Sequence, residues 1–248
     1  MLLAGKTAVI TGCLQGIGQA TLVAFARQGA NLFACVQQED EAFLAFIRDL
    51  SEEHGVSITP VSFDLLDDAS IKNAAMTIQK AKQPIDILVN VAGITLDALF
   101  PMVTLAQMQK TFTINFFSQM VFTQYITRLM LRNKRGSIIN IASISGLDGN
   151  VGQLSYSASK AAMVAATKTL SAELAPQGIR VNAVAPGVIK TAMTENLPES
   201  VVAEKMAAAA ISRPGLAEEV ANTLCWLASD AASYVTGQVI RVDGGIGH

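Results

Sequence analysis

Residues 6–29, KTAVITGCLQGIGQATLVAFARQG, decide the fold. They open with a short apolar, β-branched run at 6–11, pass through a turn with three glycines, and end in an amphipathic pattern closed by Gly29. This order predicts a strand, a tight turn and a helix. Because the next apolar run follows at 31–36, we expect two parallel strands joined by a right-handed helical crossover.

The same turn predicts a binding site for a dinucleotide. Gly12, Gly16 and Gly18 are spaced so that the backbone turns tightly, main-chain N–H groups approach a pyrophosphate, and the helix packs closely on the strand. The amino terminus of the helix faces the anion, and Gln15 and Ile17 lie beside it in the turn. A tight strand-to-helix connection without a ligand would use the same glycines, so the prediction depends on further motifs.

The end of the second strand bears on the choice of dinucleotide. An acid there would hydrogen-bond the ribose 2′-hydroxyl and repel a 2′-phosphate, but the positions hold Val36 and Gln37. No arginine stands at 37 to favour a phosphate, and acidic residues follow at 39–41. Because the strand tip itself lacks a carboxylate, we expect NADP(H) in preference to NAD(H).

The rest of the chain repeats the alternation of strand and helix. It predicts one domain over residues 1–248 with an α/β fold: a Rossmann-type, doubly wound parallel sheet of seven strands with helices on both faces. The further strands are expected at 57–63, 86–93, 136–143, 178–187 and 238–245, and helices at 39–53, 104–133, 155–175 and 217–229.

Ligands of doubly wound sheets bind at the carboxyl ends of the strands. Asp64 stands there after the third strand, where it would accept from an adenine amino group or cap a local turn. The Ile189 backbone and the Thr191 hydroxyl, after the sixth strand, would hold a carboxamide. The other candidates at this edge are Leu65, Asn90, Ala92, Gly93, Pro186 and Gly187.

The catalytic candidates lie in residues 143–160, SISGLDGNVGQLSYSASK. Tyr156 and Lys160 are four residues apart on a predicted helix, so both project from one face. A nearby ammonium favours the phenolate, and we expect Lys160 to lower the pKa of Tyr156 toward the working range. Ser143 ends the preceding strand, where its hydroxyl would bond the same substrate oxygen. Tyr and Lys at this spacing also occur by chance.

Two further segments carry expectations. Asn115 lies between apolar neighbours inside the predicted helix 104–133, which implies a bound water or a kink that satisfies its amide. Residues 194–215 are alanine-rich with prolines at 198 and 214, a pattern that predicts a mobile helical substrate lid.

Composition excludes several classes of protein. The 18 Lys and Arg residues nearly balance the 20 Asp and Glu residues, and the net charge of −2 comes without a basic stripe, so we expect no nucleic-acid partner. No apolar run approaches the ~20 residues that span a bilayer, so we expect no membrane association. The hydrophobic content of 51% indicates subunit contacts.

Cysteine and histidine usage narrows the class further. Three widely spaced cysteines argue against a disulfide framework, and the amino-terminal MLLAGK is too short for a signal peptide, so we expect a cytoplasmic location. The two histidines, His54 and His248, lie in a polar loop and at the end of the chain. We therefore expect neither a Ser-His-Asp hydrolase nor a metal site.

Six motifs in order and register resemble the short-chain dehydrogenase/reductase family across essentially the whole chain: TGCLQGIG, NVAG, Asn115, Ser143, YSASK and APGVIKT. Within the family, AGITLDALF, GNVGQLSYSASKAA and SYVTGQVIRVDGG are similar to bacterial 3-oxoacyl-(acyl-carrier-protein) reductases. The resemblance implies a homotetramer that reduces a 3-oxoacyl thioester with NADPH.

The resemblance also implies roles for four residues. Tyr156 would donate a proton to the ketone, Ser143 would polarise its carbonyl, and Lys160 would lower the pKa of Tyr156 and hold the nicotinamide ribose. Asn115 would anchor the water of a proton relay. Tyr156 and Lys160 would thus also contact the cofactor.

Some positions depart from the narrower pattern. Leu96 and Ala172 stand where the acyl-carrier reductases commonly have basic residues, while Arg128 and Arg132 are candidate contacts for an acidic carrier or solvated charges at a helix end. Two alternatives therefore stay open. One is an enzyme of the family that acts on another secondary alcohol or ketone, such as a polyol, sugar or steroid, and the other is a dinucleotide-binding protein without catalysis.

Overall fold

The structure is a computed structural model that describes residues 1–195 and 199–247. Seven strands form one sheet in the order β3-β2-β1-β4-β5-β6-β9, and every neighbouring pair is parallel. The predicted fold class is confirmed. The strands are β1 (Thr7–Thr11), β2 (Asn31–Val36), β3 (Ile58–Ser62), β4 (Ile87–Asn90), β5 (Gly136–Ile141), β6 (Ile179–Pro186) and β9 (Val239–Val242).

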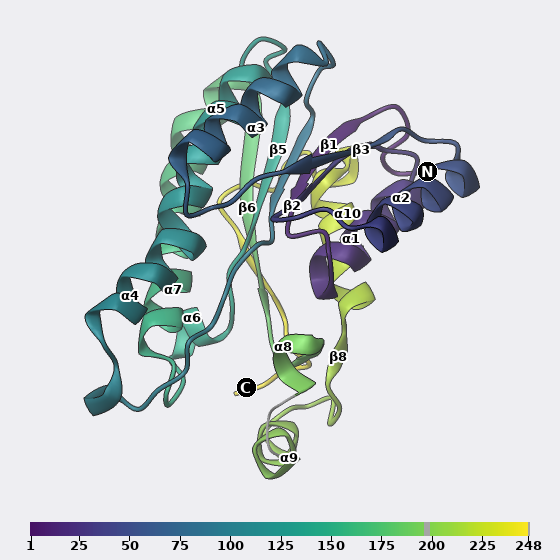
Figure 1. Ribbon diagram of the computed structural model, residues 1–248. Helices are drawn as coiled ribbons and strands as arrows, with labels where there is room; N and C mark the ends of the chain where they lie inside the picture. Colours follow the sequence, from purple (N-terminus) through teal and green to yellow (C-terminus); the bar gives the residue numbers. More distant parts are fainter. Residues whose placement is uncertain (196–198, 248) are drawn as a thin grey trace.

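Helices cover both faces of the sheet, as Figure 1 shows. One layer holds α1 (Gly16–Arg27), α2 (Glu41–His54) and α10 (Ala217–Ala228), and the other holds α3 (Asp68–Lys80), α4 (Leu105–Phe112), α5 (Ser118–Met130) and α7 (Leu154–Leu174). Each layer encloses its own apolar core against the sheet. A parallel sheet packed on both faces needs continuous apolar strands, and every residue of β1 and β4 is buried.

The helices bury the faces that their sequence periods predict. In α3 the buried side chains are Ile71, Ala74, Ala75 and Ile78, a spacing of three and four residues that marks one helical face. The carboxylate of Asp40 caps α2 by accepting from the backbone N–H of Phe43 at 2.7 Å. Local capping and apolar period therefore agree on where these helices lie.

The predicted helix 104–133 is interrupted. A π-helical turn at Thr113–Phe117 separates α4 from α5, and α5 ends at Met130. Asn115 is fully buried within that turn. The helix is thus interrupted at Asn115 by a π-helical turn, a feature that often occurs at functional sites.

The segment after β6 is built from short elements. A two-residue strand β7 (Ile189–Lys190) pairs in parallel with β8 (Gly215–Leu216), a small ladder that the sequence did not predict. Between them lie α8 (Ala192–Glu195) and α9 (Glu199–Ala207), at the end of the molecule where β6 finishes (Figure 1). Of the predicted lid, 194–215, residues 194–195 and 199–207 are helical, residues 208–214 are not, and residues 196–198 lie outside the described residues.

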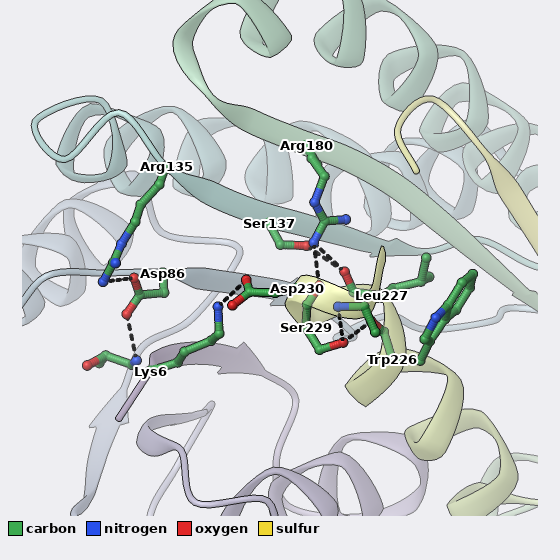
Figure 2. Close-up of polar contacts among 11 residues, drawn as sticks. Lys6, Asp86, Arg135, Ser137, Arg180, Trp226, Leu227, Ser229 and Asp230 are labelled. Atoms are coloured by element: carbon green, nitrogen blue, oxygen red, sulfur yellow. Dashed lines mark hydrogen bonds and ion pairs between the residues drawn. The ribbon is translucent and has the colours of Figure 1, made fainter. Parts of the chain in front are cut away.

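A network of charges joins the amino ends of the strands (Figure 2). Asp86, just before β4, accepts from the Thr7 N–H at 3.0 Å and pairs with Arg135 at 2.8 Å. The Arg180 guanidinium of β6 donates to the carbonyls of Leu227, Ser229 and Val235 at 2.8 to 3.2 Å. These bonds join the carboxyl end of α10 to the sheet.

Two further observations concern the apolar helices and the cysteines. In the described part of the chain, no helix combines the length and apolarity needed to cross a membrane. Cys13, Cys35 and Cys225 are buried free thiols, as the prediction of no disulfide framework requires.

Candidate active site

A cavity of about 340 Å³ opens at the carboxyl ends of β1 and β4, where the strand order reverses. Such a reversal is the usual ligand site of a doubly wound sheet. Residues expected to contact the cofactor surround it. They are Gly12, Gln15, Gly16, Ile17, Gly18, Gln37, Asp64, Leu65, Ala92, Gly93, Tyr156, Lys160 and Thr191.

The glycine turn packs so closely on the neighbouring backbone that side chains at Gly12 and Gly18 would not fit. Gly12 has a φ of +72°, and a Cβ there would lie 2.9 Å from the Cα of Ala92. A Cβ on Gly18 would lie 1.9 Å from the carbonyl oxygen of Gly12. Within the described residues, no side chain caps the amino terminus of α1 and no acid stands in its first turn. Its free N–H groups fit an anionic cofactor.

The side of the cavity at the carboxyl ends of β2 and β3 is polar. Asp64 accepts from the Leu66 N–H at 2.8 Å and from the Gln37 amide at 3.3 Å. It thus caps a local turn while its carboxylate lines the cavity. Glu39 accepts from the Ser62 hydroxyl at 2.6 Å. The carboxylate of Glu39, three residues after the end of β2, therefore has a partner on β3.

The catalytic candidates converge beside this cavity. Tyr156 and Lys160 lie one turn apart on α7, and the Lys160 Nζ is 5.8 Å from the centre of the Tyr156 ring. That ammonium donates to the Ile141 carbonyl at 2.7 Å. Ser143 follows β5, and its Oγ accepts from the Ser145 N–H at 3.1 Å. The hydroxyl, phenol and ammonium are thus held on the ends of two rigid elements.

The pKa of Tyr156 is raised, whereas the sequence-based expectation was that Lys160 would lower it. Burial is the main cause and raises the pKa of Tyr156, which the Ser143 hydrogen bond lowers and the negative charge of Asp97 raises. Lys160 is not among the causes of this change in the pKa of Tyr156. Burial instead lowers the pKa of Lys160 itself to about 8. A cavity in low dielectric disfavours both charged forms, an effect that spacing along a helix cannot reveal.

Asn115 joins the two halves of the site. Its Oδ1 accepts from the Ile94 N–H at 2.8 Å, and its Nδ2 donates to the Ile94 carbonyl at 2.9 Å and to the Ser159 hydroxyl at 3.1 Å. Protein groups thereby satisfy the amide. It ties the segment after β4 to the helix that carries Tyr156 and Lys160.

Four other candidates do not line the cavity. The Asn90 side chain is buried toward α5 and donates to Thr123 and Asn140 at 2.8 Å each. Pro186 and Gly187 end β6, where a Cβ on Gly187 would lie 2.7 Å from the Cα of Asp243. Ile189 is buried in β7 and its carbonyl accepts from the Thr194 hydroxyl at 2.6 Å. Pro186, Gly187 and Ile189 lie in the backbone segment that leads to Thr191 at the cavity.

The sequence reading missed Thr11. Its hydroxyl lines the cavity and accepts from the N–H groups of Val91 and Ala92 at 2.9 and 3.1 Å. It therefore fixes the segment after β4 against the glycine turn. A threonine at the end of the first strand, directly before Gly12, was the available signal. Over the residues described, no group of three or more His, Cys, Asp or Glu side chains is placed to hold a metal.

The chain is similar to several known oxidoreductases. A family model described as enoyl-(acyl carrier protein) reductase matches residues 12–247. A 3-oxoacyl-(acyl-carrier-protein) reductase from Thermotoga maritima is 40% identical over 249 residues, which cover 99% of this chain and 99% of the relative. Another from Aquifex aeolicus is 39% identical over 244 residues, or 98% of each chain.

A solved structure is similar over nearly the same span. It is assigned as an NAD(P)-dependent gluconate 5-dehydrogenase from Beutenbergia cavernae, with NADP bound at low occupancy. The TM-score is 0.90 and the identity 36%, and the match covers 98% of this chain and 96% of the other. The relatives thus share the fold and differ in the substrates that their names state.

Proposed function

Since the chain belongs to the short-chain dehydrogenase/reductase family and is an NAD(P)-dependent oxidoreductase acting on CH–OH or keto groups, we propose that it reduces a 3-oxoacyl thioester to the 3-hydroxyacyl form with NADPH. One observation carries the proposal. The similarity to 3-oxoacyl-(acyl-carrier-protein) reductases extends over 99% of a chain whose Ser143, Tyr156 and Lys160 converge beside the cavity.

The chain's own groups would orient the ketone and supply a proton. The bound cofactor supplies the hydride. The Tyr156 phenol, kept protonated by burial, is the proton donor to the carbonyl oxygen, and the Ser143 hydroxyl donates a hydrogen bond to the same atom. Fixed donors stabilise the developing oxyanion without reorganising. Lys160 would hold the nicotinamide ribose, and Thr191 would lie on the carboxamide side.

NADPH is the proposed cofactor form because the tip of β2 offers no acid to the ribose. Val36 and Gln37 line this end of the cavity, and the Glu39 carboxylate is bonded to Ser62. A 2′-phosphate would meet the Gln37 amide, which is held by Asp64. NADP bound to the relative from Beutenbergia cavernae supports the same choice.

The acyl group would be carried by acyl carrier protein or by coenzyme A. Among the carrier-contact candidates, Arg128 lies over the Tyr125 ring at 5.5 Å. Arg132 lines a groove with Lys80 and Lys82 at the carboxyl ends of α3 and α5. We also propose a homotetramer, because Ala161 and Ala165 leave a small-residue face of α7 exposed.

A second candidate function is oxidation or reduction of a sugar or polyol. It is favoured by the structural relative that is assigned as a gluconate 5-dehydrogenase. Substrate class separates the two candidates, because a polyol oxidoreductase would act on free alcohols and not require a thioester.

The test is the initial rate of reduced-cofactor oxidation by the purified protein with acetoacetyl-CoA, run with NADPH and with NADH. Faster turnover with NADPH is the expected result. Turnover of gluconate or 5-ketogluconate but not of the thioester would replace the proposal with the second candidate. Cofactor binding without turnover of any ketone or alcohol would point to a binding protein without catalysis.

A further inference from the structure

A chain of hydrogen bonds leads from the loop after β4 to the catalytic serine and passes through Gln153. Gln153 directly precedes α7, three residues before Tyr156. Its Nε2 donates to the Asp97 carboxylate at 3.0 Å. Its Oε1 accepts from the Ser145 hydroxyl at 3.1 Å and from the Asn150 amide at 2.8 Å.

These partners fix which way the Gln153 amide faces. A flipped amide would set its oxygen against the Asp97 carboxylate and its NH₂ against the Asn150 NH₂, so both contacts would be lost. Asp97 is itself held by the Thr95 hydroxyl. Asn150 is anchored on the other side, because its Oδ1 accepts from Lys205 of α9 at 3.1 Å. Gln153 therefore has one orientation, set from two sides.

The orientation reaches the catalytic group through one residue. Ser145 donates its hydroxyl to Gln153, and the same residue donates its backbone N–H to the Ser143 Oγ at 3.1 Å. Ser145 is also the first residue of the four-residue helix α6 (Ser145–Asp148). Moving or repelling the Gln153 amide would thus displace the donor that aims the Ser143 hydroxyl.

We propose that Gln153 is a positioning residue for the reaction, which holds Ser145 so that the Ser143 hydroxyl points at the substrate oxygen, with Asp97 as the acceptor that fixes its amide. The inference rests on the catalytic role proposed for Ser143. It predicts a defect in the chemical step and not in cofactor binding, because none of these hydrogen bonds reaches the glycine turn.

The test is a double-mutant cycle on the intact protein with Gln153→Glu and Asp97→Asn. Gln153→Glu keeps the shape but sets two carboxylates against each other, so we expect kcat to fall about 30-fold. Asp97→Asn alone should stay within about threefold of the parent, because its amide oxygen still accepts from Gln153. The double variant restores a donor–acceptor pair and should recover kcat to within about threefold of the parent.

Three readouts separate positioning from a general loss of structure. The dissociation constant for NADPH and the midpoint of thermal unfolding should stay near the parent's in all variants while kcat changes.

Gln177→Glu is the matched control, since Gln177 is exposed at the opposite edge of the sheet and the same change there should leave kcat unaltered. Ser145→Ala, which removes only the hydroxyl bonded to Gln153, should lower kcat several-fold even if Gln153→Glu folds poorly.

Two results would overturn the inference: a Gln153→Glu kcat within twofold of the parent, or a double variant no better than Gln153→Glu alone. Either result counts only when the parent protein reduces the ketone. A parent without turnover on any ketone refutes the proposed function instead, so the two failures are distinguishable.

Discussion

The two edges of the central sheet hold charge in opposite ways. At the amino edge, Asp86 pairs with Arg135, Lys6 pairs with Asp230 at 2.7 Å, and Arg180 donates to three carbonyls (Figure 2). At the carboxyl edge, Lys160 is 3% exposed, and in the described structure its hydrogen-bond partner is a single carbonyl, that of Ile141. The amino edge thus pairs its charges within the chain, whereas at the carboxyl edge Lys160 has no carboxylate partner among the described residues and donates to the Ile141 carbonyl.

The comparison separates stability from chemistry. Bonds to buried charges stabilise the fold when every partner is present, whereas an active site holds groups that are unfavourable until a substrate arrives. Substitutions at the amino edge should therefore change unfolding and spare turnover. Substitutions at the carboxyl edge should do the reverse, and the following predictions test that division.

Arg180→Met should cause the largest change in stability. It leaves three carbonyls without their donor, so we expect the free energy of unfolding to fall by about 3 kcal/mol with kcat unchanged. Urea unfolding and steady-state kinetics measure the two quantities. Arg27→Met is the control, because the 3.4 Å pair of Arg27 with Glu218 is exposed. A loss below about 1 kcal/mol, or a large change in kcat, would contradict the division.

Gly18→Ala should weaken cofactor binding. The added Cβ would lie 1.9 Å from the Gly12 carbonyl oxygen, so the turn must shift away from the pyrophosphate. We expect the cofactor dissociation constant to rise about 100-fold, or about 2.7 kcal/mol, as measured by fluorescence titration. Gly55→Ala is the control for losing a glycine outside the cavity, since Gly55 follows α2 at a φ of +64° and a Cβ there would meet open space. Equal binding by both variants would refute the role of the turn.

Lys160→Met should abolish turnover and yet stabilise the cofactor-free protein by about 1–2 kcal/mol at pH 7. Burial lowers the pKa of Lys160 to about 8 from its ordinary value of 10.5. Between these values the unfolded chain binds more protons, so parent stability rises with pH and the advantage of the variant shrinks. Unfolding at pH 7 and pH 10 measures the trend. A variant less stable than the parent at pH 7 would show that burying the Lys160 ammonium does not destabilise the fold.

Asp230→Asn should have the smallest effect. Its carboxylate is 90% exposed, and the Lys6 ammonium lowers the pKa of Asp230 below its ordinary value of 3.8. The pair therefore contributes about 0.5 kcal/mol above that value, and the contribution is lost as pH falls through the lowered pKa. Thermal unfolding of parent and variant should differ at pH 7 and coincide near pH 2. A difference that persists in acid would mean that the charge is not its source.

Much of the fold could be predicted because its signals are local. The apolar strands, the glycine turn and the period of α3 each follow from a few neighbouring residues, and their alternation leads to a parallel sheet. The π-helical turn was harder to predict, since one extra residue leaves the apolar pattern of 104–133 nearly intact. The ladder of β7 and β8 is two residues long on each side, too short for any period.

For the site, the sequence predicted which residues gather at one edge of the sheet, but not how deeply each is buried or which way its side chain faces. The sequence brings Tyr156, Lys160 and Ser143 to one edge, but burial depends on the whole fold, and it reverses the expected shift in the pKa of Tyr156. Asn90 stands at a strand tip like its neighbours, yet its side chain faces Thr123 of α5. Gln153 gave no signal in the sequence, because its partners Asp97 and Ser145 are distant or unremarkable in the chain.

The most direct measurement is the kcat of Tyr156→Phe together with its affinity for NADPH. The substitution removes only the hydroxyl that would give the proton, so we expect kcat to fall about 1000-fold while the dissociation constant stays within about twofold. The midpoint of thermal unfolding should also be retained. A variant that keeps more than a tenth of the parent's turnover would contradict the assignment of the proton donor and, with it, the account of this edge as the site of chemistry.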